Sequence, residues 1–147
     1  MTATAHALVG GAIAASISNP AFGLPLAAIS HPLIDMIPHC DFGNGWKEKS
    51  KLSLFWQASF DLLFGIVLTY LIFGGFTDLA YLTAAVFLSE TWDLMQMPYL
   101  LLGWKGPFYM FYKVQHEINA KLKFPWGILT QVVTVVFISL FLRIARF

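Results

Sequence analysis

Histidine and aspartate are concentrated in the stretch SHPLIDMIPHCD, residues 30–41, which holds two of the four histidines in the chain. His31 and Asp35 are four positions apart, so a helix carries both side chains on one face. A mixed set of imidazole and carboxylate groups suits Zn²⁺, Mn²⁺ or Fe²⁺ better than a set of thiolates or of oxygens alone. This stretch therefore predicts a site for one or two divalent metal ions.

Further ionisable residues interrupt the apolar segments elsewhere in the chain; they are His6, Asp61, Glu90 and Asp93. A charge without a partner in the middle of a bilayer costs roughly 2.5–3.5 kcal/mol, so such residues usually face a partner or a wet cavity. These segments contain no lysine or arginine that could neutralise the acids. A bound metal ion would neutralise them, and protonation, which burial favours, is the alternative.

The combined set predicts four metal ligands, which are His6, His31, Asp35 and Asp61. Glu90 and Asp93 share a helix face and are expected either to bind a second ion or to act as the general base in catalysis. Pro38 should end the helix before His39. His39 and Asp41 are therefore expected at the rim of the cavity.

Composition indicates a membrane protein. Of the 147 residues, 58% are hydrophobic and 12% are charged, whereas soluble domains carry about 25% charged residues. Apolar segments at 52–73 and 79–102 exceed 20 residues, and a third at 125–142 has 18. About 20 helical residues cross the ~30 Å hydrocarbon core of a bilayer, so we expect three long transmembrane helices.

The first 37 residues are expected to form a shorter helical hairpin. Its arms, 3–17 and 20–37, are separated by the sequence SNP, which favours a turn. A pair of glycines and many alanines in the first arm would allow close contact between the two arms. The aromatic and basic residues of 107–121 predict an amphipathic interfacial helix, which carries His116 as a further residue at the rim.

These elements together predict an all-α integral membrane protein. A short N-terminal hairpin would pack against three longer transmembrane helices and one interfacial helix, in a single domain over 1–147. Lysines concentrate between residues 47 and 51 and between residues 105 and 123, and basic loops usually stay in the cytoplasm. We therefore expect an inner or cytoplasmic membrane protein with its N-terminus in the cytoplasm.

The opening MTATAHALVGGAIA and the later SHPLIDMIPHCD resemble the membrane-bound metal-dependent hydrolase family of small bacterial and archaeal inner-membrane proteins. That family pairs a histidine in its first helix with a later His-x-x-x-Asp step and has been likened to zinc-dependent phospholipase C. The resemblance covers residues 1–45 and implies that His6, His31 and Asp35 bind metal. The family motifs LPDxDH and HRGxTH are absent from the sequence. Acids elsewhere in the chain would have to replace the ligands that these motifs supply.

The sequence leaves three functions open. The first is metal-dependent hydrolysis of a phosphoester or ester, with an anionic lipid head group at the cytoplasmic face as substrate, because the loop lysines attract anionic lipid. The second is a carrier of ions or protons, since carboxylates and histidines also form relays. The third is a structural membrane subunit whose buried carboxylates only join helices. No nucleic-acid motif is present, and the sequence does not determine the oligomeric state.

Overall fold

The computed structural model describes residues 1–41 and 45–145, and its regular elements in those ranges are helices. In chain order they are α1 (Ala3–Ser16), α2 (Pro20–Asp35), the 3-10 helix η1 (Trp46–Glu48), α3 (Lys51–Phe73), α4 (Leu79–Ser89), α5 (Thr91–Leu102), α6 (Pro107–Ile118) and α7 (Trp126–Ala145). The prediction of an all-helical chain is therefore confirmed.

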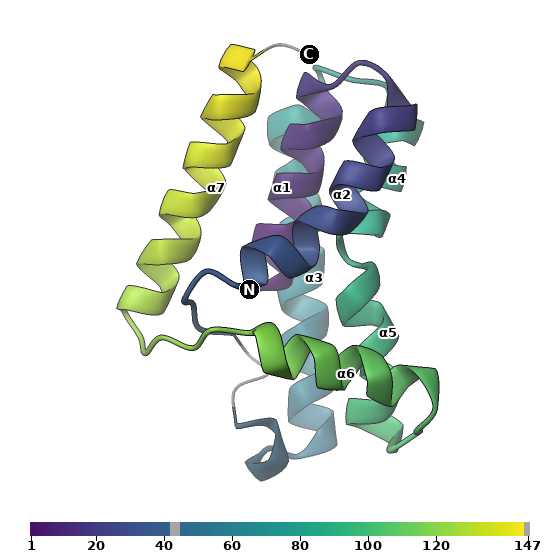
Figure 1. Ribbon diagram of the computed structural model, residues 1–147, viewed down its shortest axis with the longest axis vertical. Helices are drawn as coiled ribbons and strands as arrows, with labels where there is room; N and C mark the ends of the chain where they lie inside the picture. Colours follow the sequence, from purple (N-terminus) through teal and green to yellow (C-terminus); the bar gives the residue numbers. More distant parts are fainter. Residues whose placement is uncertain (42–44, 146–147) are drawn as a thin grey trace.

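Helix α1 lies at the centre of the molecule and packs against α2, α3, α4 and α7. In Figure 1, α3 and α7 are the longest helices, α1, α2 and α4 fill the upper half, and α6 crosses below them. The buried apolar core comes mainly from alanine, valine and isoleucine side chains of α1, with further residues from α2 and α4. The start of α1 and the end of α2 lie beside each other, about halfway along the long axis of the molecule (Figure 1).

The glycines of α1 bring its backbone close to α3 and α4. A Cβ atom added at Gly10 would lie 2.6 Å from Ser89 Oγ at the end of α4, and one added at Gly11 would collide with Thr69 of α3. Small residues permit such contacts because no side chain separates the backbones. The sequence predicted that this glycine pair would bring the two hairpin arms close together. In the structure the pair instead brings α1 close to α3 and α4.

The prediction of one helix over 79–102 is wrong, because the chain breaks at Glu90 into α4 and α5. His31 Nδ1, from α2, lies 2.5 Å from the carbonyl oxygen of Ser89. In an unbroken helix this oxygen would accept the N–H of Asp93. A histidine from a neighbouring helix has taken the place of the helical donor, and α4 ends there.

Helices α2 and α6 end before the limits of 37 and 121 that the sequence predicted. The segments that follow them pair with each other instead. His39 N donates to Ala120 O at 2.9 Å, and Leu122 N donates to His39 O at 2.7 Å, which forms an isolated parallel bridge between His39 and Lys121. The other predicted ends, outside the break at Glu90, agree with the structure to within three residues.

The contact between α1 and α3 depends on Gly65, where an added Cβ atom would lie 2.6 Å from the backbone Cα of Thr4. Gly65→Ala should lower the free energy of unfolding by about 1–3 kcal/mol, because a backbone neighbour cannot move aside as a side chain can. Thermal unfolding in detergent, followed by circular dichroism, measures the change. Gly75→Ala is the matched control, since a Cβ atom there meets nothing within 4 Å. Equal stability of the two variants would contradict the prediction.

Candidate metal centre

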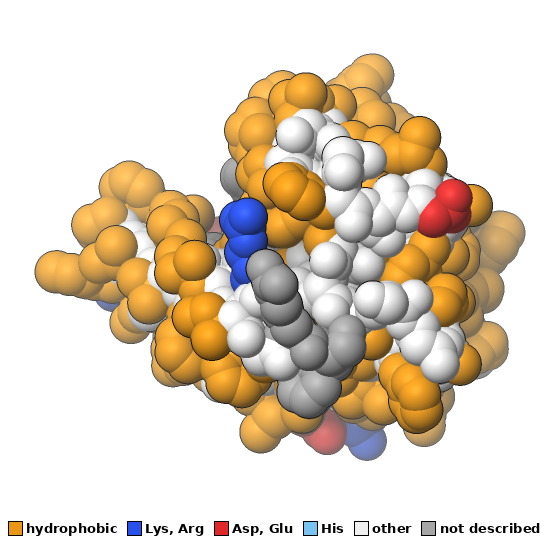
Figure 2. Space-filling model, turned by 90° about the horizontal axis from the view of Figure 1, so that it is seen from above, with side chains coloured by type: hydrophobic (Ala, Val, Ile, Leu, Met, Phe, Trp, Pro, Cys, Tyr) orange, Lys and Arg blue, Asp and Glu red, His pale blue; other side chains and the backbone are white. Residues whose placement is uncertain are grey.

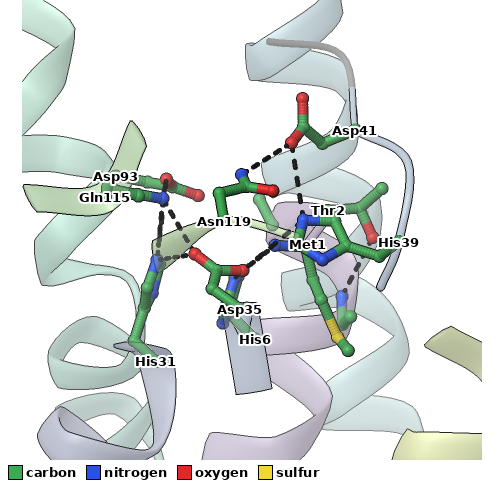
Figure 3. A network of polar contacts seen from close by, with 12 residues as sticks. Met1, Thr2, His6, His31, Asp35, His39, Asp41, Asp93, Gln115 and Asn119 are labelled. Atoms are coloured by element: carbon green, nitrogen blue, oxygen red, sulfur yellow. Dashed lines mark hydrogen bonds and ion pairs between the residues drawn. The ribbon is translucent and has the colours of Figure 1, made fainter. Parts of the chain in front are cut away.

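Three histidines surround the completely buried carboxylate of Asp35, the last residue of α2 (Figure 3). The Nε2 atoms of His6 and His39 lie 3.2 and 3.7 Å from Asp35 Oδ1, and His31 Nε2 lies 3.4 Å from Asp35 Oδ2. His31 Nε2 is also 3.6 Å from Asp93 Oδ1. Ligand atoms about 2.1 Å from one shared ion are separated by about 3.0 Å at octahedral angles and about 3.4 Å at tetrahedral angles. These distances are close to those of a metal centre.

The hydrogen bonds of two histidines fix which ring nitrogen faces Asp35. His31 Nδ1 contacts the Ser89 carbonyl at 2.5 Å, and His39 Nδ1 contacts the Ile37 carbonyl at 2.7 Å. A carbonyl oxygen can only accept, so both Nδ1 atoms must carry the proton. In the neutral ring, Nε2 then offers a lone pair. Histidines that bind metal usually donate their other N–H to a carbonyl or carboxylate in this way.

His6 reaches the same place from the first turns of α1. Its ring stacks on that of His31, with centroids 3.5 Å apart and planes 3° from parallel. Both rings are completely buried, and neither nitrogen of His6 has a hydrogen-bond partner among the described residues. One ligand atom each from His6, His31 and Asp93 lie within 4.8 Å of one another. These three residues and Asp35 form the candidate metal centre.

The side-chain amide of Gln115, on α6, lies between these groups. Its Nε2 is 3.3 Å from His31 Nε2, 3.0 Å from Asp35 Oδ2 and 2.9 Å from Asp93 Oδ1. An amide nitrogen has two hydrogens, so it cannot satisfy three acceptors at once. Its Oε1 is buried and has no hydrogen-bond partner in the described ranges. Acceptors that converge on one small centre are the arrangement that a cation requires.

Other polar groups surround the second oxygen of Asp35. The amino group of Met1 contacts Oδ1, and burial lowers the pKa of that amino group to about 6. Asp41 Oδ2 accepts a hydrogen bond from Asn119 Nδ2 at 3.2 Å and lies 3.5 Å from His39 Nε2. Burial would raise the pKa of Asp41, but His39, the Met1 amino group and Asn119 together hold that pKa below its ordinary value.

Asp61, predicted as a ligand, lies in α3 and caps the start of α1. Its Oδ2 accepts from Ala3 N at 2.7 Å, and its Oδ1 accepts from Thr4 N and Thr4 Oγ1 at 3.2 and 2.7 Å. The first N–H groups of a helix have no partner within the helix, and Asp61 supplies one. Glu90, between α4 and α5, is 2% exposed, and its Oε1 has no hydrogen-bond partner within 1–41 and 45–145.

A cavity of about 500 Å³ adjoins the candidate metal centre and is lined by residues of α3, α5 and α6. Asp61, Glu90, Asp93 and Gln115 line its polar part. Its apolar part is lined by residues that include Leu54, Phe55, Leu94, Met97 and Leu100. Lys47 and Lys121 also line it. The cavity therefore offers carboxylates, an apolar wall and cationic side chains to one ligand.

The structure brings most of the candidate residues together, but it places His39 deeper than expected. His39, expected at the rim, is completely buried, because the bridge to Lys121 holds its backbone beneath the chain that follows α6. His116 is exposed and stacks on Tyr112 with ring centroids 5.5 Å apart. Gln115 was not among the residues predicted from the sequence. The available signal was its place four residues after Phe111, on the apolar face of α6.

Comparisons of the chain with protein families, with curated proteins and with solved structures give no significant match. The resemblance to membrane-bound metal-dependent hydrolases therefore stays a prediction, and the geometry of the site carries the functional argument.

Proposed function

We propose that this chain is a membrane-embedded, metal-dependent hydrolase whose divalent ion is held by His6, His31, Asp35 and Asp93. The observation that carries the proposal is the orientation of His31. Its Nδ1 is committed to the Ser89 carbonyl, and its Nε2 faces two carboxylates at 3.4 and 3.6 Å. Two carboxylates that face the same buried imidazole nitrogen concentrate negative charge, and a divalent ion would neutralise it.

The exposed surface of the two longest helices supports a place in a membrane. Helices α3 and α7 are long and apolar enough to cross a bilayer, and only 17% of the apolar window of each is buried. The core helix of a soluble protein would be mostly buried, and large exposed apolar surfaces are rare on soluble monomers. Seen from the end that holds the α1–α2 turn, hydrophobic side chains dominate the outline and few charged groups appear (Figure 2).

The lysine-bearing loops support the orientation expected from the sequence. Trp46 of η1 contacts Tyr99 of α5 and Tyr112 of α6, with ring centroids 6.1 and 5.8 Å apart. The loop that holds Lys47 and the helix that holds Lys113 therefore lie at one end of the molecule. Basic segments on the same side favour that side as the cytoplasmic one.

A divalent ion at this centre would polarise the oxygen of an ester or phosphoester. It would also lower the pKa of water, so that hydroxide is available at neutral pH to attack the substrate. The residues of the chain supply the remaining parts. His31 and Asp35 hold the ion in place, and Gln115 orients the two carboxylates through its amide. Glu90 lines the same cavity as Asp93 and has a buried carboxylate oxygen without a partner among the described residues. It is the candidate general base.

The adjoining cavity supports a lipid head group as the substrate class. A phosphate would lie among the acids only when metal neutralises them, and the lysines at the cavity add positive charge. The apolar wall from α3 and α5 would contact the first carbons of the lipid chain. The alternatives, an ion carrier and a structural subunit, use the same carboxylates without hydrolysis, so hydrolysis and ion uptake into proteoliposomes distinguish them.

Removal of a ligand should remove the metal. Purified wild-type protein should carry Zn, Mn or Fe in a stoichiometric amount, and His31→Ala should bind the ion at least tenfold more weakly, because loss of even a supporting contact costs 10- to 100-fold in affinity. Elemental analysis by mass spectrometry measures both. Asp78→Ala is the control: it removes the side-chain cap of α4, where Asp78 Oδ1 accepts from Tyr81 N at 3.0 Å, and should lower the melting temperature while the metal content stays. A metal-free, folded wild type would contradict the proposal.

The cavity should be required for substrate binding but not for metal binding. Met97→Trp places a large ring in the apolar part of the cavity and should lower hydrolysis of a lipid substrate more than tenfold, because the substrate chain would collide with the ring. Its metal content should equal that of the wild type. Leu71→Trp is the matched control, since Leu71 is 76% exposed on α3 and does not line the cavity. Equal loss of activity in both variants would contradict the assignment.

A further inference from the structure

We propose that an anionic phospholipid binds in a groove between α3 and α7, with its phosphate at Arg143 and one acyl chain along the groove. The inference rests on the proposed place of the chain in a membrane, but it does not depend on hydrolysis. The groove is separate from the cavity beside the candidate metal centre. Among the described residues, Thr2 and Asp61 alone line both.

Three helices form this groove, which has a volume of about 830 Å³. Helix α1 packs against both α3 and α7 and forms the floor, where most of the side chains are small. The walls come from α3 and α7, whose lining residues are mainly aromatic and branched: Phe60, Phe64, Ile72, Phe73, Ile128, Val132, Val135, Val136 and Leu140. The groove is therefore apolar over most of its length.

The groove is long enough for an acyl chain. Its lining extends along α7 from Ile128 to Arg143, which is a rise of about 22 Å at 1.5 Å per residue. One leaflet accounts for half of the ~30 Å hydrocarbon core of a bilayer, or about 15 Å. A lipid whose phosphate lies at one end of the groove can therefore keep its chain in contact with the protein through the whole leaflet.

The polar residues at the Ile128 end of the groove already bind one another. Asp61 Oδ2 accepts from Ala3 N at 2.7 Å. Gln131 Oε1 accepts from Thr2 N at 2.8 Å, and Gln131 Nε2 donates to the Cys40 carbonyl at 2.6 Å. Because these groups are satisfied within the protein, this end of the groove suits the end of an acyl chain better than a head group.

The opposite end of the groove carries donors for a phosphate. The Arg143 guanidinium lies over the ring of Phe76, 5.6 Å from its centroid, and the ion pairs of the described residues do not include Arg143. Ser16, at the end of α1, and Ser139, one turn before Arg143 on α7, also line the groove. A guanidinium donates two parallel hydrogen bonds to a phosphate, and hydroxyl groups can donate more.

The position of Arg143 fits the level of lipid head groups. It lies in the last turn of α7, at the end of the molecule that holds the α1–α2 turn and away from η1 (Figure 1). Long basic side chains near the ends of transmembrane helices reach the interface while their stems stay in the apolar region. In the proposed orientation, with η1 on the cytoplasmic side, the bound lipid belongs to the opposite leaflet.

Native mass spectrometry of the purified protein with added lipid tests the charge of the ligand. The wild type should retain phosphatidylglycerol about fivefold more than phosphatidylcholine with the same acyl chains, which is the scale of the attraction of one basic residue for anionic lipid. Arg143→Gln should lose this preference. Lys105→Gln is the matched control and should keep it, because it removes an equal charge from an exposed position outside the groove.

A second pair of variants tests the place of the acyl chain. Val136→Trp should lower the retention of both lipids, because the larger ring occupies the groove that Val136 lines. Val133→Trp should retain both lipids as the wild type does, since Val133 is 58% exposed on the same helix and does not line the groove.

Equal retention of the two lipids by the wild type overturns the inference, and so does an unchanged preference in Arg143→Gln. A lipid-free dimer that Val136→Trp abolishes assigns the groove to a second copy of the chain and also overturns it. The wild-type comparison does not depend on the folding of any variant. The metal content of the same samples tests the proposed function separately: a metal-free wild type that still prefers phosphatidylglycerol overturns the hydrolase and leaves the lipid site intact.

Discussion

A completely buried carboxylate has to be neutralised, and the centre of this structure is arranged around that requirement at Asp35. An uncompensated charge in the interior costs several kcal/mol. Three histidines reach the carboxylate from three places: the start of α1, the body of α2 and the segment after α2. The helices that carry them are short, so their ends lie beside the charge. The amino group of Met1 also contacts this carboxylate, and the histidine nitrogens around it form a set of converging ligand atoms.

The hydrogen bond between His31 and the Ser89 carbonyl links the site to the fold. It fixes the protonated nitrogen of the ring, and it occupies the carbonyl at which α4 ends. The break between α4 and α5 places Glu90 at the cavity and leaves Asp93 in the first turn of α5. The helix loses its regular hydrogen bond at the Ser89 carbonyl, and this carbonyl gains the buried contact with His31. The irregular backbone at this break is satisfied by the protein itself, because the Ser89 carbonyl contacts His31.

The exposed apolar faces of α3 and α7 contrast with the buried polar centre of the molecule. Each long helix presents aromatic and branched side chains outward, while Asp61 of α3 faces the start of α1. Buried polar groups cluster because each one can hydrogen-bond to or pair with the next. The cavity beside the cluster connects the polar centre with an apolar wall.

The amino-acid sequence by itself determined the helical class and nearly all of the helix limits, and it indicated His6, His31 and Asp35 as candidate ligands, because apolar length, turn residues and the i, i+4 spacing are local properties. The tertiary structure decided what depends on other elements. It assigned Asp61 to the cap of α1, broke the helix at Glu90, buried His39 beneath the chain after α6 and brought Gln115 to the carboxylates. Each of these depends on a hydrogen bond between residues that are far apart in sequence, and no local pattern specifies such a partner.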